Sequence, residues 1–520
     1  MIFLIPIFVI LAGVAILLQR RYSPQKTQEA ARVVVKGHTY SEVIQAKATC
    51  VIESKNKVDD VRRCCIIGAG RVGIITAIVL ASKNPDVHFC VVDANERLIA
   101  AWKSDRPPIV QPGLEDLLFD DACLAIEETE KESSSTDLVQ LKDQPEVGRR
   151  RKLGNLHFSS DIGNAVAEAQ MVFLCLEMDS LDPSLAYLDP TLELIASASK
   201  NPKILVQRST SPYGTVQYIK TKLTSLSPTT PHTILTNPAF TLPSTALCET
   251  LTPSRVIIGH VYSPDSRPDD LDALKRLYRA FVPAERIVTM DAFSTELGRM
   301  GSNAVLAQQV ASLGSIHALS GGCEASSGAV GWMLGVQGEG AGEDGLGIGS
   351  VGMAGMKEAR REVRCLVEMA RELGMSEVEV YWMGVLRMQE FMVRRAVGGF
   401  IAQMETGAEG QKVAVLGVAE DVEMGAIVVK ELRGAGLLVD VVCDDSMQEK
   451  MVNEFGEGVA VPKTMGEACA GCSGIIALNA IGIQAPAWQR LAGAMKERKV
   501  LTLGGGLDRV KMKQLGFDLL

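Results

Sequence analysis

The sequence predicts an α/β protein with two Rossmann-like domains joined by a long central helix and preceded by an N-terminal transmembrane helix. Three observations support this fold class. Apolar strands alternate with helical segments over residues 59–290, and a glycine-rich turn joins the first strand to the first helix. A second strand–helix alternation begins at residue 412, and an uncharged apolar run opens the chain.

Length and composition exclude several classes of protein. The 520 residues suffice for several domains, and 47% hydrophobic residues are typical of a chain with sizeable cores. A net charge of −9 disfavours a nucleic-acid partner, because neutralising phosphates requires a basic face. The 12 cysteines follow no small-domain spacing, which indicates a reducing compartment.

The N-terminus has the features of a membrane anchor. Residues Ile2–Leu18 carry no charge, and Arg20 and Arg21 follow directly. A run of this length is near the minimum that crosses a bilayer as a helix. The basic residues after it predict a single-pass membrane protein with the rest of the chain in the cytoplasm. A cleaved signal peptide and a loosely associated extension are the alternatives. We expect an anchor over residues 1–22 and a linker over residues 23–58.

The first strand–turn–helix unit predicts a dinucleotide site. The strand Cys64–Ile67 runs into Gly68–Gly73, with the pattern G-x-G-x-x-G, and a helix is expected over Ile74–Ser82. A second strand, Val87–Val92, ends just before Asp93.

Each glycine has a physical role in this pattern. Gly68 permits the tight turn, Gly70 lets the backbone approach a pyrophosphate, and Gly73 allows close helix packing. The helix N-terminus favours negative charge, and Asp93 would accept a ribose hydroxyl and repel a 2′-phosphate, which favours NAD over NADP. A Rossmann-like domain that no longer binds nucleotide is the alternative. The proposed cofactor set is Gly68, Gly70, Arg71, Val72, Gly73, Asp93, Arg97 and Thr210.

A series of further motifs follows in a fixed order. They are Trp102–Asp105, Pro108–Leu114, Gln207–Thr210, Thr236–Phe240, Arg255–Gly259 and Ser294–Gln308. In order and spacing the series resembles the UDP-glucose/GDP-mannose dehydrogenase family, and the chain is similar to its UDP-glucose 6-dehydrogenases from about Val61 to Gly516. The resemblance implies an NAD-dependent dehydrogenase acting on a nucleotide sugar.

The resemblance also assigns the domains. Residues 59–290 are the NAD-binding Rossmann domain, with a polar insertion over residues 121–153. Residues 291–398 form a central helical region with a long helix over 292–334 and a glycine-rich loop over 335–356, and the family dimerises there. Residues 412–520 form a C-terminal Rossmann domain like the one that binds UDP in the family, with strands at Lys412–Gly417, Val439–Val442 and Gly474–Leu478.

The catalytic positions depart from the family pattern. The family captures an aldehyde with a cysteine in G-F-G-G-S-C-F-Q-K-D, and Lys357 aligns with that cysteine. Cys365, further along the same predicted helix, reads as a packing residue. A glutamate that acts as a base in the family is Ala239 here, and the active-site lysine is Arg299, which keeps the charge but cannot act as a base. Thr210 and Asn303, which position water and oxyanion in the family, remain.

The uridine-binding positions depart as well. Pro243 stands where the family has a second acid, and Glu177–Ser180 stand where it has Asn-Thr-Pro-Thr. Residues 418–423 replace the family's cationic segment after the first strand of the C-terminal domain. The late Asp-Gly-Arg-Asn is Thr502–Gly505. Because a diphosphate site needs cations, we expect a weakened uridine site.

No metal site is expected. Cys469 and Cys472 have C-x-x-C spacing without a second pair or a histidine, and Cys64–Cys65 reads as core. His260 and His317 belong to no i, i+4 histidine pair.

Three functions remain open. The first is a two-electron dehydrogenase on a nucleotide sugar or another small-molecule alcohol, with Thr210, Arg299 and Asn303 as the catalytic residues. The second is a non-catalytic NAD-binding paralogue at a membrane, held through residues 2–18. The third is an authentic UDP-glucose 6-dehydrogenase that makes UDP-glucuronate. In each case we expect a homodimer or higher homo-oligomer.

Overall fold

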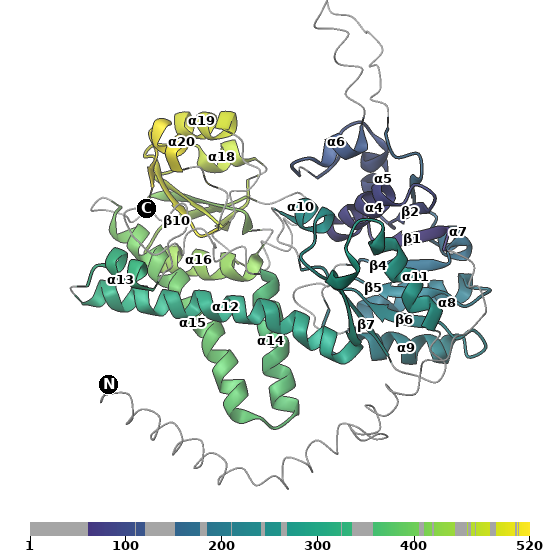
Figure 1. Ribbon diagram of the computed structural model, residues 1–520. Helices are drawn as coiled ribbons and strands as arrows, with labels where there is room; N and C mark the ends of the chain where they lie inside the picture. Colours follow the sequence, from purple (N-terminus) through teal and green to yellow (C-terminus); the bar gives the residue numbers. More distant parts are fainter. Residues whose placement is uncertain are drawn as a thin grey trace, which may run out of the picture. The chain divides into compact units, whose positions relative to one another are not determined.

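The computed structural model forms one mainly parallel and one fully parallel sheet connected by long helices (Figure 1). It describes residues 61–109, 111–119, 151–176, 185–209, 211–240, 245–261, 268–323, 325–334, 357–404, 410–418, 421–442, 459–462, 464–478, 485–504 and 509–519, with Phe455 and Leu507. The expected anchor, the linker and the loop over 335–356 lie outside these residues. Within the described part of the chain, no helix is long and apolar enough to cross a membrane.

The first sheet has the strand order β3-β2-β1-β4-β5-β6-β7-β8, in which the order reverses between β1 and β4. Its strands are β1 Arg63–Ile67, β2 His88–Val92, β3 Leu156–Ser159, β4 Met171–Leu174, β5 Ile204–Gln207, β6 Thr233–Thr236, β7 Val256–His260 and β8 Ile287–Asp291. Its helices are α4 Arg71–Lys83, α5 Glu96–Lys103, α6 Leu114–Leu118, α7 Ile162–Glu168, α8 Asp189–Ala198, α9 Thr215–Leu226, α10 Ala246–Leu251 and α11 Pro268–Arg279.

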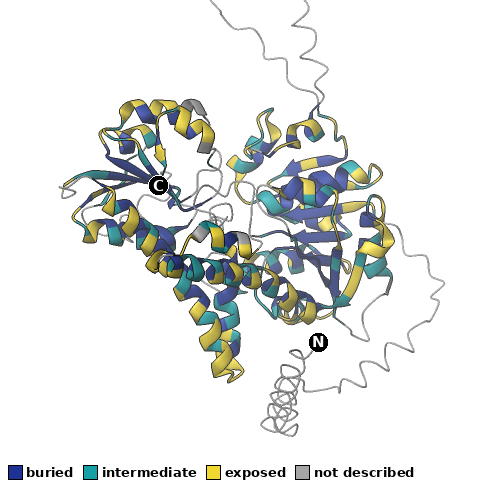
Figure 2. Cartoon of the chain, turned by 60° about the vertical axis from the view of Figure 1, so that its left-hand side comes forward, coloured by how far each residue is buried: buried dark blue, intermediate teal, exposed yellow. Residues whose placement is uncertain are grey.

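Both faces of this sheet are covered, as alternation along the strands requires. Cys64 and Ile66 of β1 pack into one apolar core with α4, α10 and α11. Cys65 and Ile67 pack into a second core with α7, α8 and α9. Figure 2 shows the strands as largely buried. The Rossmann-like alternation of strands and helices predicted for this part of the chain is therefore present, and Cys64 and Cys65 are core residues.

One strand pair of this sheet is antiparallel, unlike the others. β7 is antiparallel to β6, with Leu235 opposite His260 and Thr236 opposite Gly259. The connection through α10 does not cross the sheet, so β7 starts at the edge where β6 ends. The segment Asn237–Phe240 consequently lies at the same edge as the start of β7.

Two helices lie in the range 292–334, where one long helix was expected. α12 spans Ala292–Gly322 and α13 spans Ser327–Met333, and the backbone of Cys323 between them is extended. Gly321 and Gly322, with low helix propensity, end α12 at this point. α14 Lys357–Glu372 and α15 Ser376–Ala402 then form a hairpin around Gly374, whose φ is 68° (Figure 1).

The second sheet has the order β11-β10-β9-β12-β13-β14 and is parallel throughout. Its strands are β9 Lys412–Leu416, β10 Leu438–Val441, β11 Val459–Ala460, β12 Gly474–Ala477, β13 Lys499–Thr502 and β14 Asp518–Leu519. Its helices are α16 Val422–Gly434, α18 Met465–Cys469, α19 Ala485–Ala494 and α20 Arg509–Gln514. Val397 and Phe400 of α15 belong to its core, so that helix runs past the expected boundary at residue 398.

Candidate functional site

The turn between β1 and α4 has a geometry that only glycine permits at two positions. Gly68 has φ 109°, and a Cβ there would lie 2.3 Å from the carbonyl oxygen of Cys175. A Cβ on Gly73 would lie 1.9 Å from the carbonyl oxygen of Gly68. α4 begins at Arg71, three residues before the expected start, with Gly70 as its N-cap residue at an ordinary φ of −70°. The first turn of α4 contains no acid, which suits an anionic ligand.

Asp93 lies directly after β2 and beside this turn. Its Oδ2 accepts a hydrogen bond of 2.8 Å from the Ala69 N–H, and its Oδ1 accepts one of 2.9 Å from the Asn95 N–H. The indole N–H of Trp102 donates to the Ala69 carbonyl oxygen at 3.1 Å. A carboxylate oxygen can accept a further bond, so this constellation fits the adenosine ribose of NAD at the strand-order reversal.

Three of the other proposed cofactor residues lie on the helices that follow β1 and β2. Arg71 donates to the side chain of Gln111 across 3.5 Å, and Val72 is half-buried in the first turn of α4. Arg97 is exposed on α5. Thr210 lies outside the described residues, one position after Ser209.

A buried arginine that the sequence interpretation did not single out connects the strand ends. Arg208, just after β5, donates from Nε to the Thr76 hydroxyl of α4 at 2.7 Å. Its Nη1 donates to the backbone and side-chain oxygens of Asn237 at 2.9 and 2.8 Å. The Tyr278 hydroxyl donates to the same Asn237 side chain. This network fixes the segment after β6 relative to the nucleotide-binding helix.

The start of α12 is anchored on the first sheet. Glu296 accepts hydrogen bonds of 2.8 Å from the Gly214 and Val216 N–H groups at the start of α9. Burial raises the pKa of Glu296 to about 7, against the opposing effect of these two bonds. A Cβ on Gly259 would lie 2.5 Å from the Thr295 hydroxyl oxygen, so the helix approaches β7 closely. One turn later, this rigid start presents Arg299.

Arg299 is buried and contacts three groups. Its Nε donates to the Ala239 carbonyl oxygen at 2.8 Å, and its guanidinium lies 5.4 Å from the centre of the Phe240 ring. Its Nη1 lies 3.3 Å from Glu362 Oε1. The structure therefore brings together two predicted positions, Arg299 and Ala239, and adds an acid from α14.

Glu362 is the principal site residue that the sequence interpretation missed. Its side chain is only 3% exposed, and burial raises its pKa to about 7. Arg299, Arg361 and a hydrogen bond from Asn303 oppose that rise, whereas Glu358 adds to it. The signal was present in the helical periodicity, because Glu362 stands three residues after Ala359 and just before Val363 on the buried face of α14.

An amine occupies the position of the family's catalytic thiol. Lys357 is the first residue of α14 and is half-buried. Cys365, two turns along that helix, is half-buried, and burial raises its pKa to about 11. A thiol of that pKa stays protonated at neutral pH, and the thiolate is the nucleophilic form. Pro243, Glu177–Ser180 and the segment 351–356 lie outside the described residues.

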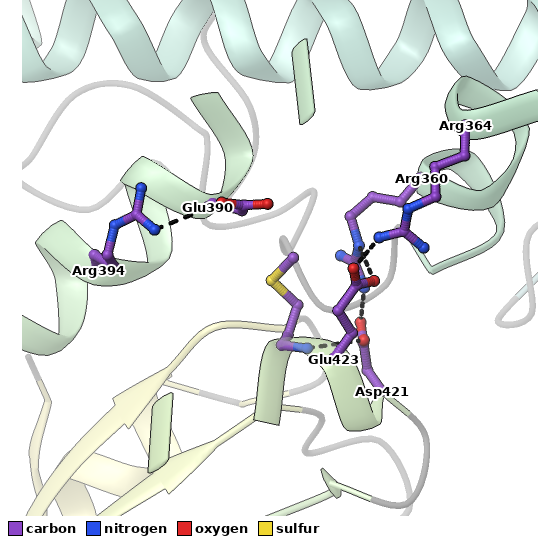
Figure 3. Close-up of polar contacts among 7 residues, drawn as sticks. Arg360, Arg364, Glu390, Arg394, Asp421 and Glu423 are labelled. Atoms are coloured by element: carbon purple, nitrogen blue, oxygen red, sulfur yellow. Dashed lines mark hydrogen bonds and ion pairs between the residues drawn. The ribbon is translucent and has the colours of Figure 1, made fainter. Parts of the chain in front are cut away.

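The corresponding turn of the second sheet is occupied by ion pairs (Figure 3). Gly417 after β9 has φ 79°, and Asp421 caps α16 by accepting from the Met424 N–H at 3.3 Å. Asp421 also pairs with Arg360 of α14, and Glu423 pairs with Arg364. The family resemblance implies a cationic diphosphate site at this turn. Here the carboxylates of Asp421 and Glu423 are paired with the guanidinium groups of Arg360 and Arg364.

Residues 121–150 of the polar insertion lie outside the described residues. Arg151, near the end of the insertion, donates to the carbonyl oxygens of Trp102 and Ser104 and so is bound to the domain. Cys469 and Cys472 are both buried. Among the residues that the structure describes, no three His, Cys, Asp or Glu side chains gather as a metal site.

Comparison with known proteins identifies a family and several relatives of this chain. Residues 62–141 and 136–282 match the NAD-binding domain of the UDP-glucose/GDP-mannose dehydrogenase family. UDP-glucose 6-dehydrogenase 5 of Oryza sativa subsp. japonica is 32% identical over 369 residues, 69% of each chain. UDP-glucose 6-dehydrogenase of Caenorhabditis elegans is 30% identical over 377 residues, 69% of this chain and 70% of that protein.

Solved structures show the same fold. A UDP-glucose dehydrogenase from the hyperthermophilic archaeon Pyrobaculum islandicum has a TM-score of 0.61 at 20% identity, covering 89% of this chain and all of that one. A UDP-D-ManNAc dehydrogenase from Pyrococcus horikoshii has a TM-score of 0.57 at 16% identity, covering 88% and 98%. Because the NAD-binding domain model matches residues 62–141 and 136–282 and the Oryza sativa enzyme is 32% identical over 69% of each chain, the chain belongs to the UDP-glucose/GDP-mannose dehydrogenase family and is an NAD-dependent dehydrogenase.

Proposed function

We propose that this dehydrogenase oxidises the primary alcohol of a nucleotide sugar, or of another small alcohol, by one hydride transfer and releases the aldehyde. The pairing of Arg299 with Glu362 beside Ala239 carries the proposal. It supplies what an alcohol oxidation needs, whereas the thiol and the base of the second oxidation are replaced by Lys357 and Ala239.

The residues divide the chemistry between them. NAD, when bound at Gly68–Gly73 and Asp93, supplies the hydride acceptor. The alcohol loses a hydride from carbon and a proton from oxygen, and Glu362 takes the proton, since its pKa of about 7 suits transfer near neutral pH. Arg299 stabilises the negative charge that develops on the oxygen, and Asn303 orients the Glu362 carboxylate.

The aldehyde would remain uncaptured. A thioester requires a thiolate, and an amine at residue 357 cannot provide one. The high pKa of Cys365 excludes it as a substitute at neutral pH. Because neither Lys357 nor Cys365 can form the thioester, the aldehyde is released after one NAD has been reduced.

The experiment uses the full-length chain in detergent with NAD and either UDP-glucose or GDP-mannose. We expect one NADH per substrate consumed, together with an aldehyde that a hydrazide reagent traps. Arg299→Ala should abolish NADH formation, whereas Lys357→Ala should leave the stoichiometry unchanged. Two NADH per substrate with release of uronate would overturn the proposal in favour of an authentic UDP-glucose 6-dehydrogenase, the activity named for the curated relatives. NAD binding without any turnover would favour the non-catalytic paralogue.

We also propose two features of assembly. The uncharged run Ile2–Leu18 supports a membrane anchor with the dehydrogenase body in the cytoplasm. The exposed apolar side chains of Phe293, Leu297 and Val305 follow one face of α12 at multiples of four residues. Such a stripe supports a homodimer formed through α12.

A further inference from the structure

α14 carries charges on two opposite sides. Arg360 and Glu362 are two residues apart, which places them about 200° apart around a helix of 3.6 residues per turn. Glu362 points to Arg299 and Asn303 of α12. Arg360 and Arg364, one turn apart, point to the start of α16 (Figure 3).

The contact with α16 is built around a buried ion pair. Arg360 Nη2 pairs with Asp421 Oδ2, and both side chains are only 3% exposed. The Arg360 Nε also lies 3.9 Å from Glu423 Oε2. Arg364 pairs with Glu423 in a more open environment, with side-chain exposures of 38% and 42%. A buried charge needs its partner, so the inner pair fixes the position of α14 more firmly than the outer one.

Asp421 has a second function at the same place. Its Oδ1 accepts the Met424 N–H and so caps α16, while its Oδ2 holds Arg360. One carboxylate thus joins the first turn of α16 to the first turn of α14. The C-terminal sheet is thereby connected to the helix that carries Glu362.

From this connection we infer that Arg360 and Asp421 are positioning residues: their ion pair holds α14 in the register at which Glu362 meets Arg299. The inference rests on the proposed function only for its kinetic consequence. A misplacement of about 1 Å in a catalytic group can lower a rate about 100-fold, so the C-terminal domain contributes to catalysis through α14.

The test variant is Asp421→Asn. Asparagine is as good an N-cap residue as aspartate, so α16 keeps its cap while Arg360 loses its counter-charge. The control is Glu390→Gln, which also removes one carboxylate near Arg364 but breaks only the surface pair with Arg394 on α15. Glu423→Gln is a milder second variant, because its pair with Arg364 is half-exposed.

The first readout needs no activity. In each background, the difference in Tm between the Glu362 form and its Glu362→Gln form is followed against pH. This difference changes between the unfolded-state and folded-state pKa values of Glu362, so the pH at which it levels off gives the midpoint of Glu362 titration in the folded protein. Because burial is the main cause of the raised pKa of Glu362, loosening α14 should admit water and lower the midpoint. We expect a fall of about one pH unit in Asp421→Asn, less in Glu423→Gln and none in Glu390→Gln.

The second readout is the kcat for NADH formation, with NAD affinity as a check on the first domain. We expect kcat to fall about 100-fold in Asp421→Asn with NAD affinity unchanged. If the wild type forms no NADH, the proposed function fails, and the midpoint comparison still decides the positioning role. An unchanged midpoint in folded Asp421→Asn protein, or an equal change in Glu390→Gln, would overturn the inference.

Discussion

Replacing Glu362 by glutamine should change how the stability of the protein depends on pH. Burial raises the pKa of this carboxyl from 4.5 to about 7 in the folded chain. The folded state therefore holds the proton more tightly than the unfolded state between these values. The stabilisation of the folded state by protonated Glu362 is fully present below pH 4.5. It is lost as the pH rises through about 7. Glutamine resembles the protonated acid and cannot ionise, so the variant keeps its stability over that interval.

The magnitude follows from the shift. A rise from 4.5 to about 7 corresponds to about 3 kcal/mol, at about 1.36 kcal/mol per pH unit. At roughly 2–4 °C per kcal/mol for a domain of this size, the Tm of Glu362→Gln relative to wild type should rise by several degrees between pH 5 and pH 8.

Thermal unfolding of both proteins across this range measures the difference. Burial also raises the pKa of Glu296 to about 7. Glu296 changes the stability of both proteins equally, so its effect cancels in the Tm difference. Glu368→Gln, which removes an exposed acid from the same helix, is the matched control and should show no such trend. A Tm difference for Glu362→Gln that is independent of pH would refute the assignment of a raised pKa to this group.

The other predictions concern the cofactor, the anchor and the oligomer. Gly73→Ala should weaken NAD binding measured by calorimetry, because the added methyl meets the Gly68 carbonyl oxygen and overpacking costs about 1–3 kcal/mol. Asp93→Ala should weaken NAD binding and reduce its preference over NADP, and equal affinity of the wild type for both would contradict the role of Asp93. Full-length protein should sediment with membranes and resist alkaline carbonate, deletion of residues 1–22 should release it, and a fully soluble intact chain would contradict the anchor. Val305→Glu should convert a dimer to a monomer in light scattering, and a wild-type monomer would contradict the proposed α12 interface.

The sequence predicts the nucleotide-binding unit well because its determinants are local. The apolar run of β1, the glycines and the acid after β2 lie within 31 residues, Arg63 to Asp93, and each constrains its neighbours directly. The structure confirms the requirement for glycine at residues 68 and 73. The early start of α4 at Arg71 shows the limit of such reasoning, since helix periodicity does not mark the first turn.

The candidate site was harder to predict because it depends on distant pairs. Arg299 and Glu362 are 63 positions apart, and Arg360 and Asp421 are 61 apart. Alignment with the family identified Arg299 and the residue at the thiol position. It did not reveal that α14 would turn an acid toward Arg299, because that depends on how three helices pack. The break after Gly322 was missed for a simpler reason, since the long uncharged stretch masked two consecutive glycines.

The two Rossmann-like turns now differ in their electrostatics, and this difference bears on which part of a nucleotide sugar the protein holds. The first turn of α4 has no acid and carries Arg71, so the partial positive charge of the helix end remains for an anion. At the start of α16, Asp421 and Glu423 are opposed by Arg360 and Arg364, which leaves two negative and two positive charges paired with each other. A diphosphate entering there would have to displace a carboxylate from an arginine, one of them buried, before it gained a contact. Anion affinity should therefore be concentrated at the first turn, and we expect the second turn to bind a diphosphate more weakly than the family resemblance alone implies.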